Sequence, residues 1–431
     1  MSDTDNRVVV DPTVPYATSE FGLRARHVSG HRGRRVEDLV RPGLRRNPKR
    51  AHLWVSTVLG KHIPVSPEVI FAAAGELGEL ATSALHARGA DDALVFGFAE
   101  TATGLGHAVA HRMGAGHYLQ STRRSEPHVP VVARFEEGHS HATDHLVVPT
   151  DSQGLLTDLP VVLVDDEIST GATALDAIRS MQEIHHRSLY VVASLVDMRT
   201  DRDVARCRER ADELGIDIDF ISLAQGVTSI PEDLPAQVVA LPPGPAHQAG
   251  SPGRYERLDV SWPQHVPDGG RYGFDHSDWA EFDQAVTVVT TQVAAALDPA
   301  RPVIVIGHEE LMYLPQRIAG ELSAMLDGPV LSQTTTRSPA HVIDHGGYPL
   351  RRGYRFDAPE SDVATDRFLY NATRQHPGSQ LVIVLDAPAD TPALTAPGGL
   401  VETLRAGGDD VFAVIVPGTD YRALQTRRGQ R

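Results

Sequence analysis

The chain is short of cysteine, of lysine and of long apolar runs. Its 431 residues include one cysteine, Cys207, so no disulfide can form within the chain. No apolar run approaches the roughly 20 residues that a membrane-spanning helix needs. The residues after Met1 lack the basic and apolar regions of a signal peptide. We therefore expect a cytoplasmic protein that does not enter the membrane.

Positive charge is also scarce. Lys plus Arg total 40 against 56 Asp plus Glu, which gives a net charge of −16 at pH 7. The nucleic-acid backbone repels an acidic protein, so we expect no nonspecific binding to DNA or RNA. Lys49 and Lys61 are the only lysines. Clusters of the more numerous arginines can still bind phosphorylated metabolites.

The most informative stretch is residues 161–173, which read VVLVDDEISTGAT. The first four residues are typical of a strand that a parallel sheet buries on both faces. Residues 174–178 then predict a helix, so residues 170–173 lie at a helix N-terminus, where unpaired amides and the helix dipole favour an anion. Asp165 and Asp166 can accept hydrogen bonds from paired hydroxyls. A ribose with a 5′-phosphate matches this set of groups.

This stretch resembles the phosphoribosyl pyrophosphate (PRPP) motif of type I phosphoribosyltransferases: four apolar residues, two acids, a short spacer and Thr-Gly-x-Thr. An ordinary strand with a solvated acid pair and a capped helix is the alternative. A dinucleotide-binding fold is disfavoured, because no Gly-x-Gly-x-x-Gly with a downstream acid is present in the sequence.

Further segments make the chain similar to the two-part phosphoribosyltransferase of bacterial tellurium-resistance (ter) stress clusters, whose carboxy-terminal part is named for Thr-Arg-Ser-Pro (TRSP). These segments are residues 47–52, 59–64, 97–104 and 336–339. The resemblance implies an α/β fold with a doubly wound parallel sheet of type I phosphoribosyltransferase kind. It also implies Mg²⁺-dependent transfer of a phosphoribosyl group from PRPP to an acceptor that the sequence does not identify.

The resemblance assigns the ribose hydroxyls and the stabilisation of a cationic ring to Asp165 and Asp166. Substrate phosphates and water normally supply most of the oxygen ligands of Mg²⁺. We therefore expect no separate cluster of metal-binding side chains. Glu100 would face the metal or the acceptor. The other expected substrate-binding residues are Thr170, Gly171, Ala172 and Thr173 at the 5′-phosphate, Ser169 at the place that faces the base, Thr101 and Thr103 at the pyrophosphate, and Lys61, Arg123, Arg124 and Arg134 at phosphate oxygens. Plainer alternatives are a helix cap at Thr101 or Thr103 and a solvated lysine at position 61.

Residues 134–145 form a long polar segment. The resemblance places here the loop that closes over the active site and excludes water. We expect His139 and His141 to contact phosphate or to donate protons during catalysis. The spacing His-x-His-x3-His is also compatible with zinc, which stays open as the alternative.

Ser169 bears on the choice of acceptor. Purine-salvage members of the family commonly carry an aspartate at this place, facing the base. A hydroxyl is a poor proton acceptor, so this residue is not expected to deprotonate a ring nitrogen. The sequence therefore favours an acceptor that is already nucleophilic.

The chain is long enough for two domains or three. We expect an irregular segment at 1–30, a phosphoribosyltransferase domain at 31–241, a Pro- and Gly-rich linker at 242–254, a TRSP domain at 255–420 and a tail at 421–431. Residues 32–50, rich in Arg and Pro, need not be rigid. The predicted elements are helices at 67–88, 103–113 and 278–297 and strands at 93–98, 116–121, 160–164 and 189–196.

The second half repeats the plan of the first. Residues 302–307 mirror the strand at 93–97, residues 331–338 mirror 119–125, and residues 381–386 mirror 160–165, in the same order. In this alignment Asp386 stands opposite Asp165 and Arg337 opposite Arg124. Ala387, Pro392 and Leu394 stand opposite Asp166, Gly171 and Thr173, so the PRPP motif is lost. The sequence predicts one catalytic domain and one degenerate relative, with chance similarity between α/β domains as the alternative.

Three functions are compatible with these observations. The leading one is an enzyme. A sensor would keep the ribose pocket without turnover, and a scaffold in a stress complex would explain the degenerate half but not the intact motif. Partners of this protein could be a second copy of the chain or other stress-cluster proteins.

Overall fold

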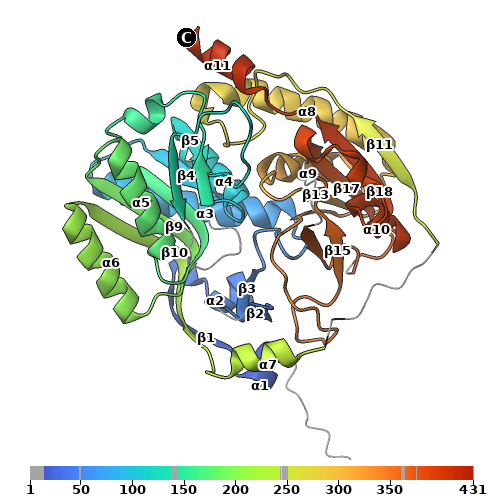
Figure 1. Cartoon of the computed structure of the whole chain (residues 1–431), viewed down its shortest axis with the longest axis horizontal. Helices are drawn as coiled ribbons and strands as arrows, with labels where there is room; N and C mark the ends of the chain where they lie inside the picture. The colour runs from blue at the N-terminus through green and yellow to red at the C-terminus, as the bar shows by residue number, and fades with distance from the viewer. Residues whose placement is uncertain are drawn as a thin grey trace, which may run out of the picture.

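The computed structural model describes residues 14–47, 50–136, 144–242, 244, 251–360, 365–374 and 376–430. These residues form two mainly parallel sheets, each with helices packed against it, that lie side by side (Figure 1). The first has seven strands in the order β1-β10-β9-β8-β4-β5-β12, and the second has five in the order β11-β18-β17-β13-β14. The expected α/β fold class is confirmed. No helix in these ranges is both long enough and apolar enough to cross a membrane.

The first sheet consists of β1 (Arg24–Gly30), β4 (Leu94–Gly97), β5 (His117–Gln120), β8 (Val161–Ile168), β9 (Leu189–Asp197), β10 (Asp217–Ser229) and β12 (Phe274–Asp275). Its helices are α1 (Tyr16–Phe21), α2 (Val36–Leu39), α3 (Pro67–Ala87), α4 (Thr103–Met113), α5 (Ala172–Ile184), α6 (Asp201–Leu214) and α7 (Leu234–Ala240). Two further antiparallel hairpins form separate two-stranded sheets: β2 (Val40–Leu44) with β3 (His52–Ser56), and β6 (Ala133–Glu136) with β7 (Asp144–Val147).

The second sheet consists of β11 (Tyr255–Asp259), β13 (Val303–Gly307), β14 (Val330–Thr334), β17 (Gln380–Asp386) and β18 (Asp410–Val416). It is accompanied by α8 (Trp279–Ala296), α9 (Tyr313–Met325), α10 (Leu400–Ala406) and α11 (Tyr421–Gly429), and by the hairpin of β15 (Gly353–Asp357) and β16 (Asp366–Tyr370). The predicted helices and strands are therefore present, with small shifts at their ends.

Strand β8 shows why this sequence places its acids at an edge. Val161 and Leu163 pack with α5, and the alternate residues Val162 and Val164 pack in the core shared with α3 and α4, so the strand is buried on both faces. Gly97, the last residue of β4, pairs with Val164. Beyond that pair β8 continues only beside β9, to Ile168, which is four residues further than expected. The acids thus lie where one neighbouring strand has already ended.

The two halves share one strand order. The sequence β9-β8-β4-β5 in the first sheet corresponds to β18-β17-β13-β14 in the second, and all these neighbours are parallel. Along the chain a hairpin follows β5 in the first half and β14 in the second. Each hairpin bridges to the segment directly after that strand, through Thr122 and Leu146 or through Thr336 and Phe368. The predicted relation between the halves is confirmed at the level of strand order.

The pairing of the strands shows that the alignment of the two halves made from the sequence is wrong by one residue in two places. Gly97 pairs with Gln120 and Val164, and Gly307 pairs with Thr334 and Val384. Counting onward, Asp386 corresponds to Asp166 and not to Asp165. In the same way Arg337 corresponds to Arg123, and Ser338 corresponds to Arg124. Runs of apolar residues look alike when shifted by one, so only the hydrogen-bonded ladder fixes the register.

The chain ends are more ordered than the sequence predicted. The segment 1–30 was expected to be irregular, but α1 and β1 lie within it, and β1 pairs antiparallel with β10. Likewise the segment 32–50 contains β2, and the expected tail contains α11. Beyond the linker, β12 pairs with β5 of the first sheet. The proposed boundary at 242–254 therefore does not separate the two sheets, because a strand that follows it belongs to the first sheet.

Helices α4 and α9 bring the halves into direct contact. A side chain at Gly104 would place its Cβ 2.7 Å from Gln316 on α9, so glycine permits the close approach. Nearby, His107 stacks between Tyr118 and Tyr313, with ring centroids 4.4 and 3.9 Å away. A single buried apolar cluster includes residues from both halves, among them Val109, Phe282 and Ile318. This contact fixes the second half against the carboxyl ends of the strands in the first.

Candidate functional site

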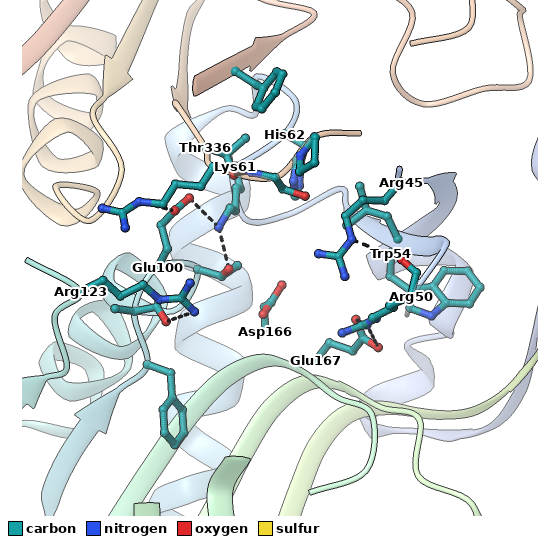
Figure 2. A pocket seen from close by; sticks show the side chains of 18 of the residues that line it. Arg45, Arg50, Trp54, Lys61, His62, Glu100, Arg123, Asp166, Glu167 and Thr336 are labelled. Carbon is teal, nitrogen blue, oxygen red and sulfur yellow. Dashed lines mark hydrogen bonds and ion pairs between the residues drawn. The ribbon is translucent and has the colours of Figure 1, made fainter. Parts of the chain in front are cut away.

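A cavity of about 520 Å³ lies at the carboxyl ends of β4, β5 and β8 (Figure 2). Both halves and the β2–β3 hairpin line it. From the first half come Phe98, Ala99, Glu100, Thr101, Arg123, His145, Asp165, Asp166, Glu167 and Thr173; from the hairpin and the loop after it Arg45, Arg50, Leu53, Trp54, Lys61 and His62; and from the second half Thr336, Arg337, Ser338, Pro339, Thr365, Asp366, Arg367 and Phe368.

The two predicted acids lie in this cavity. Figure 2 shows the Asp166 carboxylate pointing into its centre. Asp165 turns back at its own strand end, where its Oδ1 accepts the Asp166 amide at 2.9 Å. Both side chains are partly exposed, so they can accept hydrogen bonds from a ligand.

The turn from β8 into α5 has the geometry of a tight anion cradle. Gly171 has φ +80°, which an L side chain rarely adopts, and a Cβ there would lie 2.7 Å from Cys207 Sγ. Helix α5 begins at the next residue, and Thr173 in its first turn lines the cavity. Ser169, Thr170, Gly171 and Ala172 connect the acids to that turn. The structure thus brings the acids and a helix N-terminus to one place, as the sequence predicted.

Lys61 is buried and paired. Its Nζ donates to Thr101 Oγ1 at 2.6 Å and lies 3.1 Å from Glu100 Oε1. The residue is 4% exposed, which excludes the alternative of a solvated lysine. Thr101 does not cap a helix, because α4 begins at Thr103 and no side chain caps it. Lys61, Glu100 and Thr101 form one polar wall of the cavity, in which the ammonium and the carboxylate are paired.

Several predicted contacts are not among the residues that line this cavity: Thr103, Arg124, Arg134, and Ser169, Thr170, Gly171 and Ala172 of the turn. Thr103 is buried, and its Oγ1 donates to the Glu310 carbonyl at 3.0 Å. Arg134 is exposed on β6, beside a separate cleft with Ser180 and Glu183. The predicted loop residues His139 and His141 lie outside the described residues. His145, which follows them, is buried and lies 2.8 Å from Ser121 Oγ.

Arg123 and Arg124 point to different places, one into the cavity and the other into the second half. Arg123 lines the cavity, and its backbone amide donates to Glu310 Oε1 at 2.7 Å. Arg124 turns into the second half, where its Nη1 donates to Asp386 Oδ2 at 2.5 Å. Because Asp386 corresponds to Asp166, Arg124 fills the place in the second half that the cavity occupies in the first. Its counterpart Ser338 is short, and it lines the open cavity.

Asp386 is held ionised in this contact. It is 3% exposed and also accepts from Arg271. Burial alone raises the pKa of a carboxyl, but Arg124 and then Arg271 hold the pKa of Asp386 below its ordinary value. The acid that corresponds to a ribose ligand is thus used to join the halves.

Arg337 brings a second-half charge to the cavity. Its Nη2 donates to Glu309 Oε2 at 2.5 Å, and its Nε lies 3.8 Å from Glu100 Oε2. Glu309 also accepts from Arg367 and is 0% exposed. Burial opposes its ionisation, yet His308 and Arg337 hold the pKa of Glu309 below its ordinary value. A buried anion therefore positions two guanidinium groups that line the cavity.

Within the described ranges, one group has the spacing of metal ligands: His308, Glu309 and Glu360. His308 Nε2 lies 3.0 Å from Glu360 Oε2, and Arg367 Nη2 donates to Glu360 Oε1 at 2.9 Å. Since arginines already neutralise both carboxylates, this group is an internal ion-pair network and is not a good site for a cation.

The sequence interpretation missed one wall of the cavity. Arg45, Arg50 and Trp54 come from the β2–β3 hairpin, and Glu167 comes from the end of β8. Arg50 Nη2 donates to both carboxylate oxygens of Glu167, at 2.8 and 2.7 Å. The signal available was the arginine-rich composition of residues 32–50, which is equally typical of an irregular segment.

The cavity lies between an α/β domain with a mainly parallel sheet and a second α/β region. Residues 39–227 match the family model described as phosphoribosyl transferase, and residues 268–404 match the one described as TRSP domain C terminus to PRTase_2. The chain therefore carries a phosphoribosyl transferase domain followed by a TRSP domain. No curated protein matches the sequence significantly.

Several solved structures are similar to part of the chain. Adenine phosphoribosyltransferase from Rhodothermus marinus is 20% identical over 44% of this chain and 96% of its own, with a TM-score of 0.31. The Giardia lamblia enzyme is 18% identical over 43% and 93%, with a TM-score of 0.31. The Trypanosoma brucei enzyme, solved with AMP, pyrophosphate and ribose-5-phosphate, is 11% identical over 44% and 77%, with a TM-score of 0.32.

Proposed function

We propose that this protein transfers a phosphoribosyl group from PRPP to an acceptor that is already nucleophilic, with Mg²⁺ bound to the donor. One observation carries the proposal: a pair of acids, the N-terminus of α5 and a buried lysine meet in one cavity. The match to a phosphoribosyl transferase model over residues 39–227 supports it. The cytoplasmic location and the stress context rest on the sequence resemblance.

Each part of the donor has a complementary wall in the cavity. The 5′-phosphate would lie at the turn 169–173, where the first amides of α5 lack intrahelical partners. The ribose hydroxyls would donate to Asp165 and Asp166. The pyrophosphate would lie against Lys61, Thr101 and Arg123, since a cation and a hydroxyl are suitable donors to its oxygens.

In the reaction, the bond between ribose C1 and the pyrophosphate oxygen breaks and both electrons leave with pyrophosphate. The ring carries positive charge in the transition state, and the carboxylates of Asp165 and Asp166 are placed to stabilise it. The second half covers the cavity and reduces the access of water to that cation. Arg337, through its contact with Glu100, would hold the pyrophosphate side of the site.

Oxygen ligands at the cavity fit Mg²⁺. The ion prefers carboxylates, phosphates and water, and Asp165, Asp166 and Glu100 supply carboxylate oxygens beside the expected phosphates. When bound, Mg²⁺ would neutralise charge on the leaving pyrophosphate.

Replacing both acids tests the proposal. We expect Asp165→Asn with Asp166→Asn to abolish release of pyrophosphate, because the ring loses its counter-charge, while the melting temperature changes little because both side chains are partly exposed. Pyrophosphate release from Mg²⁺-PRPP would be measured with pools of nitrogen-containing acceptors. Full activity in the double variant would overturn the assignment. PRPP binding by calorimetry without turnover of any acceptor would instead favour a sensor.

A further inference from the structure

Glu310, a residue of the second half, holds the segment of the first half that carries Arg123. Its Oε2 accepts the Thr122 hydroxyl at 2.6 Å, and its Oε1 accepts the Arg123 backbone amide at 2.7 Å. Glu310 lies between β13 and α9, is 3% exposed and does not line the cavity. The carboxylate therefore uses both of its oxygens on two consecutive residues shortly after the end of β5.

The backbone of Glu310 holds a second segment of the first half. The Thr103 hydroxyl donates to the Glu310 carbonyl at 3.0 Å, and the Thr103 carbonyl accepts from the Tyr118 hydroxyl at 2.8 Å. Thr103 is the first residue of α4 and comes two residues after Thr101. One residue of the second half thus contacts both segments of the first half against which the pyrophosphate would lie, at 100–103 and at 122–123.

The first half has a glutamate at the corresponding position, and that residue is used differently. Because Gly97 and Gly307 occupy the same place in their sheets, Glu100 corresponds to Glu310. Glu100 lines the cavity, and its Oε2 lies 3.8 Å from Arg337 Nε, beyond hydrogen-bond distance. Of the two glutamates, one faces the cavity and the other fixes the segment opposite.

The contact with Glu310 is not needed to form the turn that it holds. The Thr122 hydroxyl oxygen accepts the Arg124 amide at 3.1 Å, and in the second half the Thr336 hydroxyl oxygen accepts the Ser338 amide at 3.1 Å. The second turn has this bond although the glutamate opposite it is paired with a lysine. Glu310 therefore determines where the segment lies and not which conformation it adopts.

We propose that Glu310 is a positioning residue for the pyrophosphate part of the donor. Through the Thr122 hydroxyl and the Arg123 amide it holds the Arg123 side chain at the cavity (Figure 2). Through its own carbonyl it holds the start of α4. The second half then fixes the wall against which the leaving group lies, besides covering the site. This inference rests on the proposed function, because it assumes that pyrophosphate binds at this wall.

Two variants separate the reach of this side chain from its charge. Glu310→Asp keeps the carboxylate, but its side chain is one methylene shorter and cannot bond to both donors. Glu310→Gln keeps the length and loses the charge. Its amide oxygen can accept from the Arg123 amide, and its amide nitrogen can donate to the Thr122 hydroxyl oxygen. A positioning role depends on reach, whereas removal of a buried negative charge would by itself strengthen the binding of an anion.

Calorimetric titration of the full-length protein with Mg²⁺ would measure the Kd of PRPP, inorganic pyrophosphate and ribose 5-phosphate. In Glu310→Asp we expect the Kd of PRPP and of pyrophosphate to rise about tenfold, because two buried hydrogen bonds are weakened. The Kd of ribose 5-phosphate, which has no pyrophosphate, should stay within about twofold. In Glu310→Gln all three values should stay within about threefold, because both bonds can form.

Glu281→Asp is the matched control, because Glu281 is an exposed acid of the second half that does not line the cavity. It should change none of the three values. Glu310→Ala also lacks the reach and should repeat the selective loss, so the test does not depend on one variant.

Three outcomes would overturn the positioning role: an equal loss of ribose 5-phosphate binding, unchanged pyrophosphate and PRPP binding in Glu310→Asp and Glu310→Ala, or stronger pyrophosphate binding in Glu310→Gln. A wild-type protein that binds neither PRPP nor ribose 5-phosphate would instead remove the proposed function itself, so the two failures are distinguishable.

Discussion

Two buried carboxylates at the junction of the halves are each paired with two arginines. Glu309 is fully buried between Arg337 and Arg367, and Asp386 is buried between Arg124 and Arg271. Removing one member of such a group leaves an uncompensated charge in a low-dielectric environment. The cavity thus depends on residues that do not line it, because Glu309 orients the guanidinium groups of Arg337 and Arg367.

We predict that Glu309→Gln lowers the free energy of unfolding at pH 7 by about 3–5 kcal/mol, because the buried Arg367 and the partly buried Arg337 lose the carboxylate that they share. The pKa of Glu309 is lowered on folding, so its stabilisation is present above its ordinary value of 4.5 and is lost as the pH falls below it. The difference between wild type and variant in urea unfolding should therefore shrink below about pH 4.5. Glu402→Gln, at an exposed helix pair, is the control. A constant difference down to pH 3 would contradict the assignment.

At the scale of elements, the path from strand to helix determines the site. Strand β8 extends beyond the end of β4, and α5 begins directly after Gly171. The two acids and the N-terminus of α5 therefore lie on one short segment. Strand β8 could be predicted from the sequence, because four apolar residues and two acids follow one another directly at 161–166. The β2–β3 hairpin was not predictable, since Pro42 and Gly43 within β2 argue against a strand. It is held by contacts with the second half, such as Leu44 N donating to the Tyr348 hydroxyl at 2.9 Å.

We predict that Gly171→Ala weakens PRPP binding at least about tenfold, because the positive φ and the contact with Cys207 would force the cradle to move. Calorimetric titration with Mg²⁺-PRPP would measure this. Gly114→Ala is a matched control: its φ is +66°, but its Cβ would meet no atom within 4 Å. That variant should be strained by about 1 kcal/mol and bind PRPP normally. Equal affinities in both variants would argue against a phosphate at this turn.

At the scale of the whole molecule, the two halves form one structural unit. Their apolar cores merge between α4 and α9, β12 joins the first sheet, and α11 returns to it, where Arg428 donates to Thr150 Oγ1 at 2.6 Å. The repeated strand order could be predicted from the sequence because each half repeats the same succession of apolar runs. The placement of the two halves relative to each other could not be predicted, because it depends on how the side chains of α4 and α9 pack together.

We predict one cooperative unfolding transition for the full chain. A shared core makes separate unfolding of either half expose apolar surface on the other, so the halves should lose structure together. Differential scanning calorimetry should give equal calorimetric and van't Hoff enthalpies. Two resolved peaks, or a stable fragment ending near residue 241, would show that the halves are independent.

Arg124 and Ser338 occupy corresponding positions in the two halves, and the difference has a consequence for the history of the molecule. A dimer of identical subunits must carry the same residue at both copies of a position, so it can have two open sites or two filled ones. A single chain that contains both copies is free of that symmetry. Arginine in one copy and serine in the other give one open site and one fixed joint, a division of labour that gene duplication and fusion permit and that a symmetric homodimer cannot achieve.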